Sequence, residues 1–193
     1  MKIKPELLLG SKKDIFYNKI LITGSDESYI SYIKDFVVSN FKKKGFYIDV
    51  SGNHNDGLVG NLFSKNKTLF LLTDYLIKNK NPDIGVDENQ CVLITSVNSK
   101  KTNLLKSTFT KSKDALVIEC YLLNRSAKET ALKTFLENNK LYLSGDVFWY
   151  VVDNFDNNYV IFINQLQMLS LFNKKIDLIT DVEKITCVET KIE

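Results

Sequence analysis

Short apolar runs alternate with amphipathic stretches through the chain up to about residue 123. The runs are KILIT, GFYIDV, KTLFLLT, QCVLITS and ALVIEC. Between the first two, apolar residues recur at helical spacing from Tyr29 to Phe41, and a second helical pattern surrounds Leu105. This alternation is typical of a parallel sheet with crossover helices. The sequence therefore predicts an α/β domain with a parallel sheet over residues 1–123.

The pattern after residue 123 contains helical periodicity alone. Serine or threonine followed three residues later by glutamate forms a capping box, and apolar residues at helical spacing follow. We expect helices to begin at Ser126, at Ser144, near Asn157 and at Thr180. These helices predict a small second domain over residues 124–193.

The composition indicates a globular protein of 193 residues, because 44% hydrophobic content is enough to bury a core. The longest apolar runs, such as TLFLL and YVIFI, fall far short of the roughly 18 residues of a membrane span. The N-terminal segment MKIKPELLLGSKK has too little apolar length for a signal peptide. We expect a cytoplasmic protein.

The net charge is +3, and lysine carries almost all of the positive charge, since Arg125 is the one arginine. Lysines cluster at 42–44, 100–101 and 174–175 without aromatic residues interleaved among them. We interpret these clusters as solvated helix ends. The basic balance is therefore weak support for nucleic-acid binding.

The residue types that most often carry catalysis or bind metals are few. Cys91, Cys120 and Cys187 are widely spaced among apolar neighbours, which favours free buried thiols. His54 lies in the polar run SGNHNDG, without partners at metal-ligand spacing. Trp149 lies close to a helical apolar stripe and is expected to be a packing residue or a domain-interface residue. We predict no catalytic residue and no metal site.

The turn after the first apolar run has the layout of a phosphate-binding loop but not its residues. Such a loop reads G-x-x-x-x-G-K-[ST], so that backbone N–H groups and a lysine surround the phosphates. In KILITGSDESYI the only glycine is Gly24, and the lysine is missing. Asp26 and Glu27 place negative charge at the start of the helix, where phosphate would bind. The turn predicts a nucleotide-binding architecture without a bound nucleotide.

The segment GLVGNLFSKNKTLFLLT contains an adjacent apolar pair, Leu62 and Phe63, before a charged turn and an apolar strand. The pair either closes the core or projects from a short helix as an anchor for a partner. As an anchor, each side chain could contribute roughly 1.5–3 kcal/mol of transfer free energy. Two such residues are enough for a hot spot.

The segments LITGSDESYI, NLFSKNKTLFLL, VLITSVNSKKTNLLKS and VIECYLLNRSAKET, in this order, resemble the delta subunit of the bacterial DNA polymerase III clamp loader. The resemblance extends from about Lys19 to Thr186. It implies an AAA+ type α/β domain followed by a helical lid, without a working ATP site, cofactor or metal. The run ending VLITSVN fits, because no Asp–Glu pair follows it to hold magnesium.

The resemblance also implies a function in DNA replication. In this family a Leu–Phe pair inserts into a pocket of the sliding clamp (the beta subunit), and the matching positions here are Leu62 and Phe63. Delta opens the ring for loading onto primed DNA, while ATP chemistry belongs to partner subunits (gamma/tau and delta prime) of this nucleotidyltransferase assembly. A helical collar domain typical of the family is expected to be absent from the sequence up to Glu193.

Two alternatives remain open at this point. One is a divergent nucleotide-binding enzyme that uses the turn at Gly24 in a non-standard way, although Asp26 and Glu27 oppose phosphate there. The other is a DNA-binding AAA+ relative, which predicts a steep salt dependence of binding to primed DNA.

Overall fold

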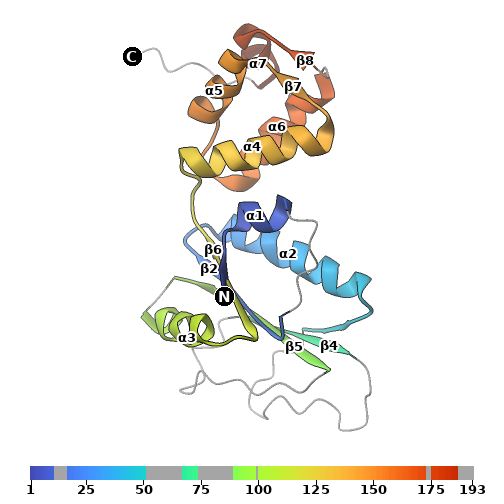
Figure 1. Cartoon of the computed structure of the whole chain (residues 1–193), viewed down its shortest axis with the longest axis vertical. Helices are drawn as coiled ribbons and strands as arrows, with labels where there is room; N and C mark the ends of the chain where they lie inside the picture. Colours follow the sequence, from blue (N-terminus) through green and yellow to red (C-terminus); the bar gives the residue numbers. More distant parts are fainter. Residues whose placement is uncertain (11–16, 51–66, 74–88, 99, 173–174, 187–193) are drawn as a thin grey trace. The chain divides into compact units, whose positions relative to one another are not determined.

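The chain folds as two compact units, an α/β unit (Met1–Tyr121) and a helical unit (Leu122–Glu193) (Figure 1). The computed structural model describes residues 1–10, 17–50, 67–73, 89–98, 100–172 and 175–186.

The α/β unit contains a six-stranded parallel sheet with the strand order β1-β6-β2-β5-β4-β3. All five apolar runs are strands, so this prediction is confirmed. The edge strand β1 was not expected, because its two residues are recognisable as a strand only by pairing with β6. The strands are β1 (Lys2–Ile3), β2 (Lys19–Gly24), β3 (Tyr47–Asp49), β4 (Thr68–Thr73), β5 (Gln90–Val97) and β6 (Ala115–Cys120).

Helices cover both faces of this sheet, which explains why its central strands are apolar without alternation. Figure 1 shows α1 (Pro5–Gly10) and α2 (Glu27–Lys43) on one side and α3 (Lys100–Lys111) on the other. On the α3 side, Leu105 and Phe109 pack in one buried cluster with Leu21 of β2. The neighbouring residues of β2 point to the opposite face, which α2 covers.

Helix α2 presents the apolar stripe expected from the sequence. Tyr29, Ile33, Val37 and Phe41 are at most 2% exposed, and Phe36 is half-buried. Each buried side chain of this size contributes roughly 1.5–3 kcal/mol relative to leaving it in water. The stripe therefore fixes which face of α2 packs on the sheet.

In its described residues, the helical unit contains four helices and a two-stranded parallel sheet that the sequence did not predict. Its elements are α4 (Arg125–Asn139), β7 (Tyr142–Leu143), α5 (Gly145–Asn154), α6 (Tyr159–Phe172), β8 (Lys175–Ile176) and α7 (Ile179–Thr186). Phe155 and Phe162 meet edge to face in its core, with ring centroids 6.2 Å apart. None of the helices in the described ranges is both long and apolar enough to cross a membrane.

Two of the expected helix starts in this unit are wrong. Helix α5 is capped by Ser144 as predicted, but α4 begins at Arg125, with Asn124 accepting the Ala127 N–H at 2.9 Å. The asparagine side chain caps the helix earlier, so Ser126 lies inside the first turn. Helix α7 likewise begins before Thr180. A capping-box pattern also occurs inside a first turn, which is why spacing alone misplaced these two starts.

Candidate functional site at the carboxyl ends of the strands

Ligands of open parallel sheets bind outside the carboxyl ends of the strands. In this protein we call the residues at the ends of β2, β5 and β6 (23–28, 96–98 and 119–121) the carboxyl edge. Two backbone hydrogen bonds join the three strand ends. The Asn98 N–H donates to the Gly24 carbonyl at 2.9 Å, and the Asp26 N–H donates to the Cys120 carbonyl at 3.2 Å. The turn after β2 is therefore held from both sides.

Glycine is the one residue type that this turn accepts at position 24, where β2 ends. Its φ is +152°, and a Cβ atom added there would lie 1.7 Å from the carbonyl oxygen of Cys120. Any side chain would overlap backbone atoms of β6, which cannot move without breaking the sheet. Only Ser25 and Asp26 then connect β2 to α2. This connection is too short to surround a phosphate in the manner of a P-loop.

Asp26 occupies the N-terminus of α2 with its own carboxylate. The side chain is buried, and its Oδ1 accepts hydrogen bonds from the Tyr29 N–H at 3.0 Å and the Ser28 hydroxyl at 2.6 Å. In a phosphate-binding loop, amides in this place face the ligand. Here a carboxylate of the chain takes that position and interacts favourably with the helix dipole.

Two further titratable groups lie near this helix start. Glu6, from α1, is 8% exposed, and burial raises the pKa of its carboxyl. The pKa of the Cys120 thiol is raised by burial first and then by the negative charges of Asp26 and Glu6. The thiol is therefore protonated and weakly nucleophilic at neutral pH. The electrostatics at this turn disfavour both a bound phosphate and a thiolate.

A chain of polar side chains continues along the carboxyl edge. The Thr23 hydroxyl donates to Asn98 Oδ1 at 3.2 Å, and Asn98 Nδ2 donates to the Tyr121 hydroxyl at 3.1 Å. The Tyr121 hydroxyl in turn donates to Glu119 Oε1 at 3.4 Å. These side chains bond one another, so the edge links β2, β5 and β6 with side chains as well as backbone.

Glu119 anchors that chain of side chains to neighbouring elements. Its side chain is 9% exposed and forms ion pairs with Lys2 of β1 and Lys106 of α3. A nearly buried carboxylate needs such partners, because a lone buried charge is costly. Among the described residues, no group of three or more His, Cys, Asp or Glu side chains is placed to hold a metal. Glu119 is thus engaged in holding β1 and α3 to β6.

The predicted clamp-binding residues, Leu62 and Phe63, lie outside the described residues, as do His54 and Cys187. The structure therefore does not test this part of the predicted site.

The other residues considered from the sequence have defined places. Cys91 and Cys120 are buried free thiols, as expected, and burial raises the pKa of Cys91 to about 11. Trp149 is 44% exposed, and the guanidinium carbon of Arg125 lies 4.9 Å from the centroid of its ring. Arg125 also forms a two-point ion pair with Asp153, with N–O distances of 2.9 and 3.2 Å. Trp149 is thus a partly exposed residue that packs against Arg125.

Sequence reasoning missed several residues at or beside the carboxyl edge. Asn98 had a usable signal, because it directly follows a predicted strand of a parallel sheet. Glu6 had none, since the short helix α1 brings it to the site through the pairing of β1 with β6. Glu119 interrupts an apolar strand, and its two lysine partners come from distant parts of the chain.

Comparison with known proteins shows that the fold of this chain is similar to that of solved structures. No protein-family model and no curated protein sequence matches the chain significantly. Among solved structures, the DNA clamp loader delta protein of Bacillus subtilis matches with a TM-score of 0.51 at 13% identity, over 88% of this chain and 57% of that chain. The RuvB Holliday junction branch migration motor of Thermotoga maritima matches with a TM-score of 0.45 at 13% identity, over 88% of this chain and 60% of that chain.

The likeness to the clamp loader delta protein confirms the predicted fold, a parallel-sheet α/β domain followed by a small helical domain. The resemblance stated from the sequence is also confirmed at the level of fold. The chain spans 57% of the length of that delta protein.

Proposed function

We propose that this chain is a non-catalytic clamp-loader subunit that binds and opens the sliding clamp of DNA polymerase III for loading onto primed DNA. The observation that carries the proposal is the fold likeness to a DNA clamp loader delta protein over 88% of the chain. The order of the segments that resemble the delta family supports it further. The proposal places the protein in the cytoplasm, as part of the replication machinery.

The turn after β2 supports a subunit without ATP chemistry of its own. Asp26 holds the helix N-terminus where a phosphate would bind, and Gly24 is confined against Cys120. We infer that ATP is hydrolysed by partner subunits of the gamma/tau type and that delta prime completes the assembly. The role of this chain is then mechanical.

Clamp binding is assigned to Leu62 and Phe63, on the resemblance of their segment to the delta family. Opening the ring requires only that the chain bind the open ring better than the closed one, because a ligand shifts an equilibrium by its differential affinity. To take the ring from mostly closed to mostly open, this difference must reach several kcal/mol. Two buried apolar anchors supply a difference of that order if their pocket on the clamp accepts them in the open ring and not in the closed one.

The test is the affinity of the purified chain for its cognate clamp, compared with a Leu62→Ala/Phe63→Ala variant. We expect the variant to lose more than about 2 kcal/mol, or roughly 30-fold in Kd. The matched control is Leu171→Ala/Leu178→Ala, which removes two exposed apolar side chains (86% and 60%) from the helical unit. The control is expected to bind like the unaltered chain.

Different failures of this test have different meanings. If the Leu62→Ala/Phe63→Ala variant binds the clamp as tightly as the unaltered chain and the control do, the anchor assignment is wrong and the clamp-loader role stands. If the unaltered chain ignores the clamp at high micromolar concentration, the proposed role itself fails. Saturable ATP binding by the chain alone, measured by calorimetry, would instead support a nucleotide-dependent enzyme.

A further inference from the structure

Lysines gather at the end of the sheet opposite to the carboxyl edge. We call the residues that precede or begin β2, β3, β4, β5 and β6 (17–19, 42–47, 67–68, 89–90 and 111–115) the amino edge. Seven lysines lie here, and the one carboxylate among the described residues of this edge is Asp114, whose Oδ2 is 3.6 Å from Lys19 Nζ. The lysines are Lys19, Lys42, Lys43, Lys44, Lys67, Lys111 and Lys113.

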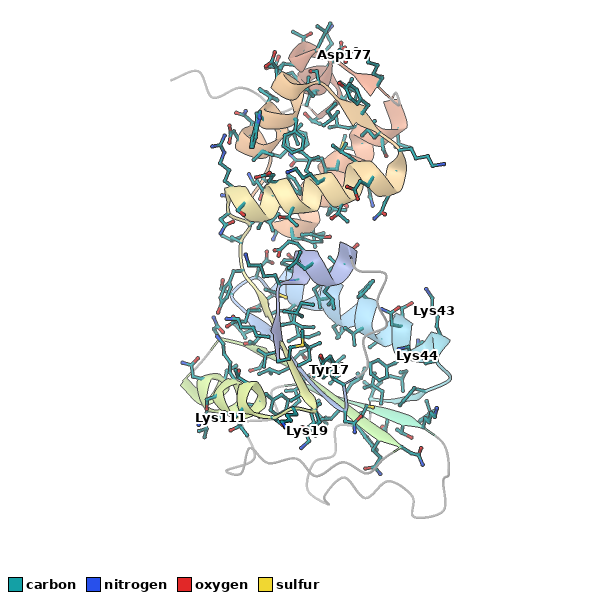
Figure 2. The ribbon with its side chains drawn as sticks, viewed as in Figure 1. Tyr17, Lys19, Lys43, Lys44, Lys111 and Asp177 are labelled. Atoms are coloured by element: carbon teal, nitrogen blue, oxygen red, sulfur yellow. The ribbon has the colours of Figure 1, made fainter. Side chains whose placement is uncertain are left out.

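These lysines come from four separate places in the sequence, and the parallel sheet brings them to one edge. The Lys19 N–H donates to the Asp114 carbonyl at 3.3 Å, and the Tyr47 N–H donates to the Lys67 carbonyl at 2.8 Å. Neighbouring strands lie about 4.8 Å apart, so the row from β6 to β3 spans roughly 19 Å. Figure 2 shows Lys111 at the end of α3, Lys19 at the start of β2 and Lys43 at the end of α2.

The exposed side chains of this edge are charged or polar, with one exception. The exception among the described residues of the edge is Tyr47, a large hydrophobic side chain that is 67% exposed. Phe46 beside it is buried. The exposed lysines are Lys42, Lys43, Lys67, Lys111 and Lys113.

Such an edge lacks the apolar centre of a protein–protein interface. Its free energy of binding would come from charge and from one aromatic ring. This combination matches a nucleic-acid strand, whose phosphates pair with lysines and whose unpaired bases stack on aromatic rings.

We propose that the amino edge binds single-stranded nucleic acid, with the lysines on its phosphates and Tyr47 stacked on a base. Lysine is a point charge without the two-pronged geometry by which arginine reads guanine, so binding is independent of sequence. A single strand fits better than a duplex, because a stacked duplex presents no free base face to Tyr47. The inference concerns the chain by itself and stands whether or not it binds a clamp.

The first experiment measures binding of the full chain to a labelled oligothymidylate of about 20 nucleotides, longer than the roughly 4–16 nucleotides of one binding fold. If about four phosphates are neutralised, affinity should fall about 50-fold between about 50 and 200 mM salt. A Lys43→Gln/Lys67→Gln/Lys113→Gln variant should show a log–log salt slope smaller by about 2. An unchanged slope in this variant overturns the proposal.

The matched control is Lys133→Gln/Lys140→Gln/Lys184→Gln, which removes the same charge from exposed lysines of the helical unit. It should change affinity by less than about 3-fold, which is the scale of a general charge effect at this salt concentration. If it weakens binding as much as the edge variant does, the location is wrong. A Lys43→Arg/Lys67→Arg/Lys113→Arg variant should retain binding, which separates loss of charge from loss of fold.

The second experiment tests the stacking residue. Tyr47→Thr keeps a residue suited to a strand and should weaken binding about 5-fold or more, given about 1–3 kcal/mol per stacked base. Tyr142→Thr is the control, because Tyr142 is also exposed (58%) and lies in a short strand, but in the helical unit.

If a duplex binds as tightly as the single strand and Tyr47→Thr has no effect, the single-strand assignment is overturned. If polyglutamate displaces the oligonucleotide at equal charge, the edge binds acidic protein instead.

Discussion

The two edges of one parallel sheet have opposite chemistry. At the carboxyl edge, Asp26 and Glu119 are nearly buried and each is bonded to other groups of the chain. At the amino edge, lysines such as Lys43 and Lys67 are exposed. Charged residues alone therefore do not mark a binding surface. Side chains that satisfy one another hold the fold, whereas exposed charges of one sign can attract a partner of the opposite sign.

The difference also separates this protein from proteins that bind a nucleotide at a P-loop. In an active P-loop protein the carboxyl edge is the open, anion-binding side. Here that side is closed by Gly24, Asp26 and their contacts with β6. Any function of the α/β unit is then expected on other surfaces.

The largest effect is expected from Gly24→Ala. The new Cβ would overlap the Cys120 carbonyl oxygen, at 1.7 Å, in a backbone conformation that alanine rarely adopts. We expect a loss of more than about 4 kcal/mol in the free energy of unfolding, or no folded α/β unit, as measured by urea unfolding with circular dichroism. Gly145→Ala is the control, because nothing lies within 4 Å of its added Cβ. Equal stability of the two variants would mean that the turn is far looser than described.

A smaller loss is expected from Asp26→Ala. This substitution removes the cap of α2 and its two hydrogen bonds, which should cost about 1–2 kcal/mol in the free energy of unfolding. Asp26→Asn should recover most of that loss, since asparagine also caps helices. If Asp26→Ala were as stable as the unaltered chain, the carboxyl edge would not depend on its internal bonds.

Glu6→Gln should mainly change how the free energy of unfolding depends on pH. Burial raises the folded-state pKa of Glu6 above its usual value of 4.5. Its neutral form is therefore favoured in the folded protein, and this stabilisation is present below about pH 4.5 and lost as pH rises through the folded pKa. The variant should gain stability relative to the unaltered chain above that pH and match it near pH 4. Unfolding curves across this range measure the difference, and parallel curves would contradict it.

The smallest effect on stability is expected at the amino edge. The Lys43→Gln/Lys67→Gln/Lys113→Gln variant should keep its free energy of unfolding within about 0.5 kcal/mol, because these side chains are exposed. The same variant should strongly weaken nucleic-acid binding, so stability and binding separate at this edge. A large loss of stability here would show that the lysines are structural and remove the contrast between the edges.

Much of the α/β unit could be predicted from local pattern. The apolar runs and the stripe from Tyr29 to Phe41 are properties of neighbouring residues, and hydrophobic burial acts on them wherever the chain goes. The short elements could not be predicted this way. Strand β1 and the pair β7 and β8 have two residues each, and they exist only because distant segments supply hydrogen bonds.

The sequence by itself determined the parallel sheet, its main helices, the buried cysteines and a phosphate turn that lacks its lysine. Periodicity and residue type act locally, so these features are readable one segment at a time. Only the tertiary structure decided that Glu6 and Cys120 lie beside Asp26, that Glu119 has two lysine partners, and that lysines from four segments share one edge. Electrostatic interactions depend on distance in space, and strand order sets that distance.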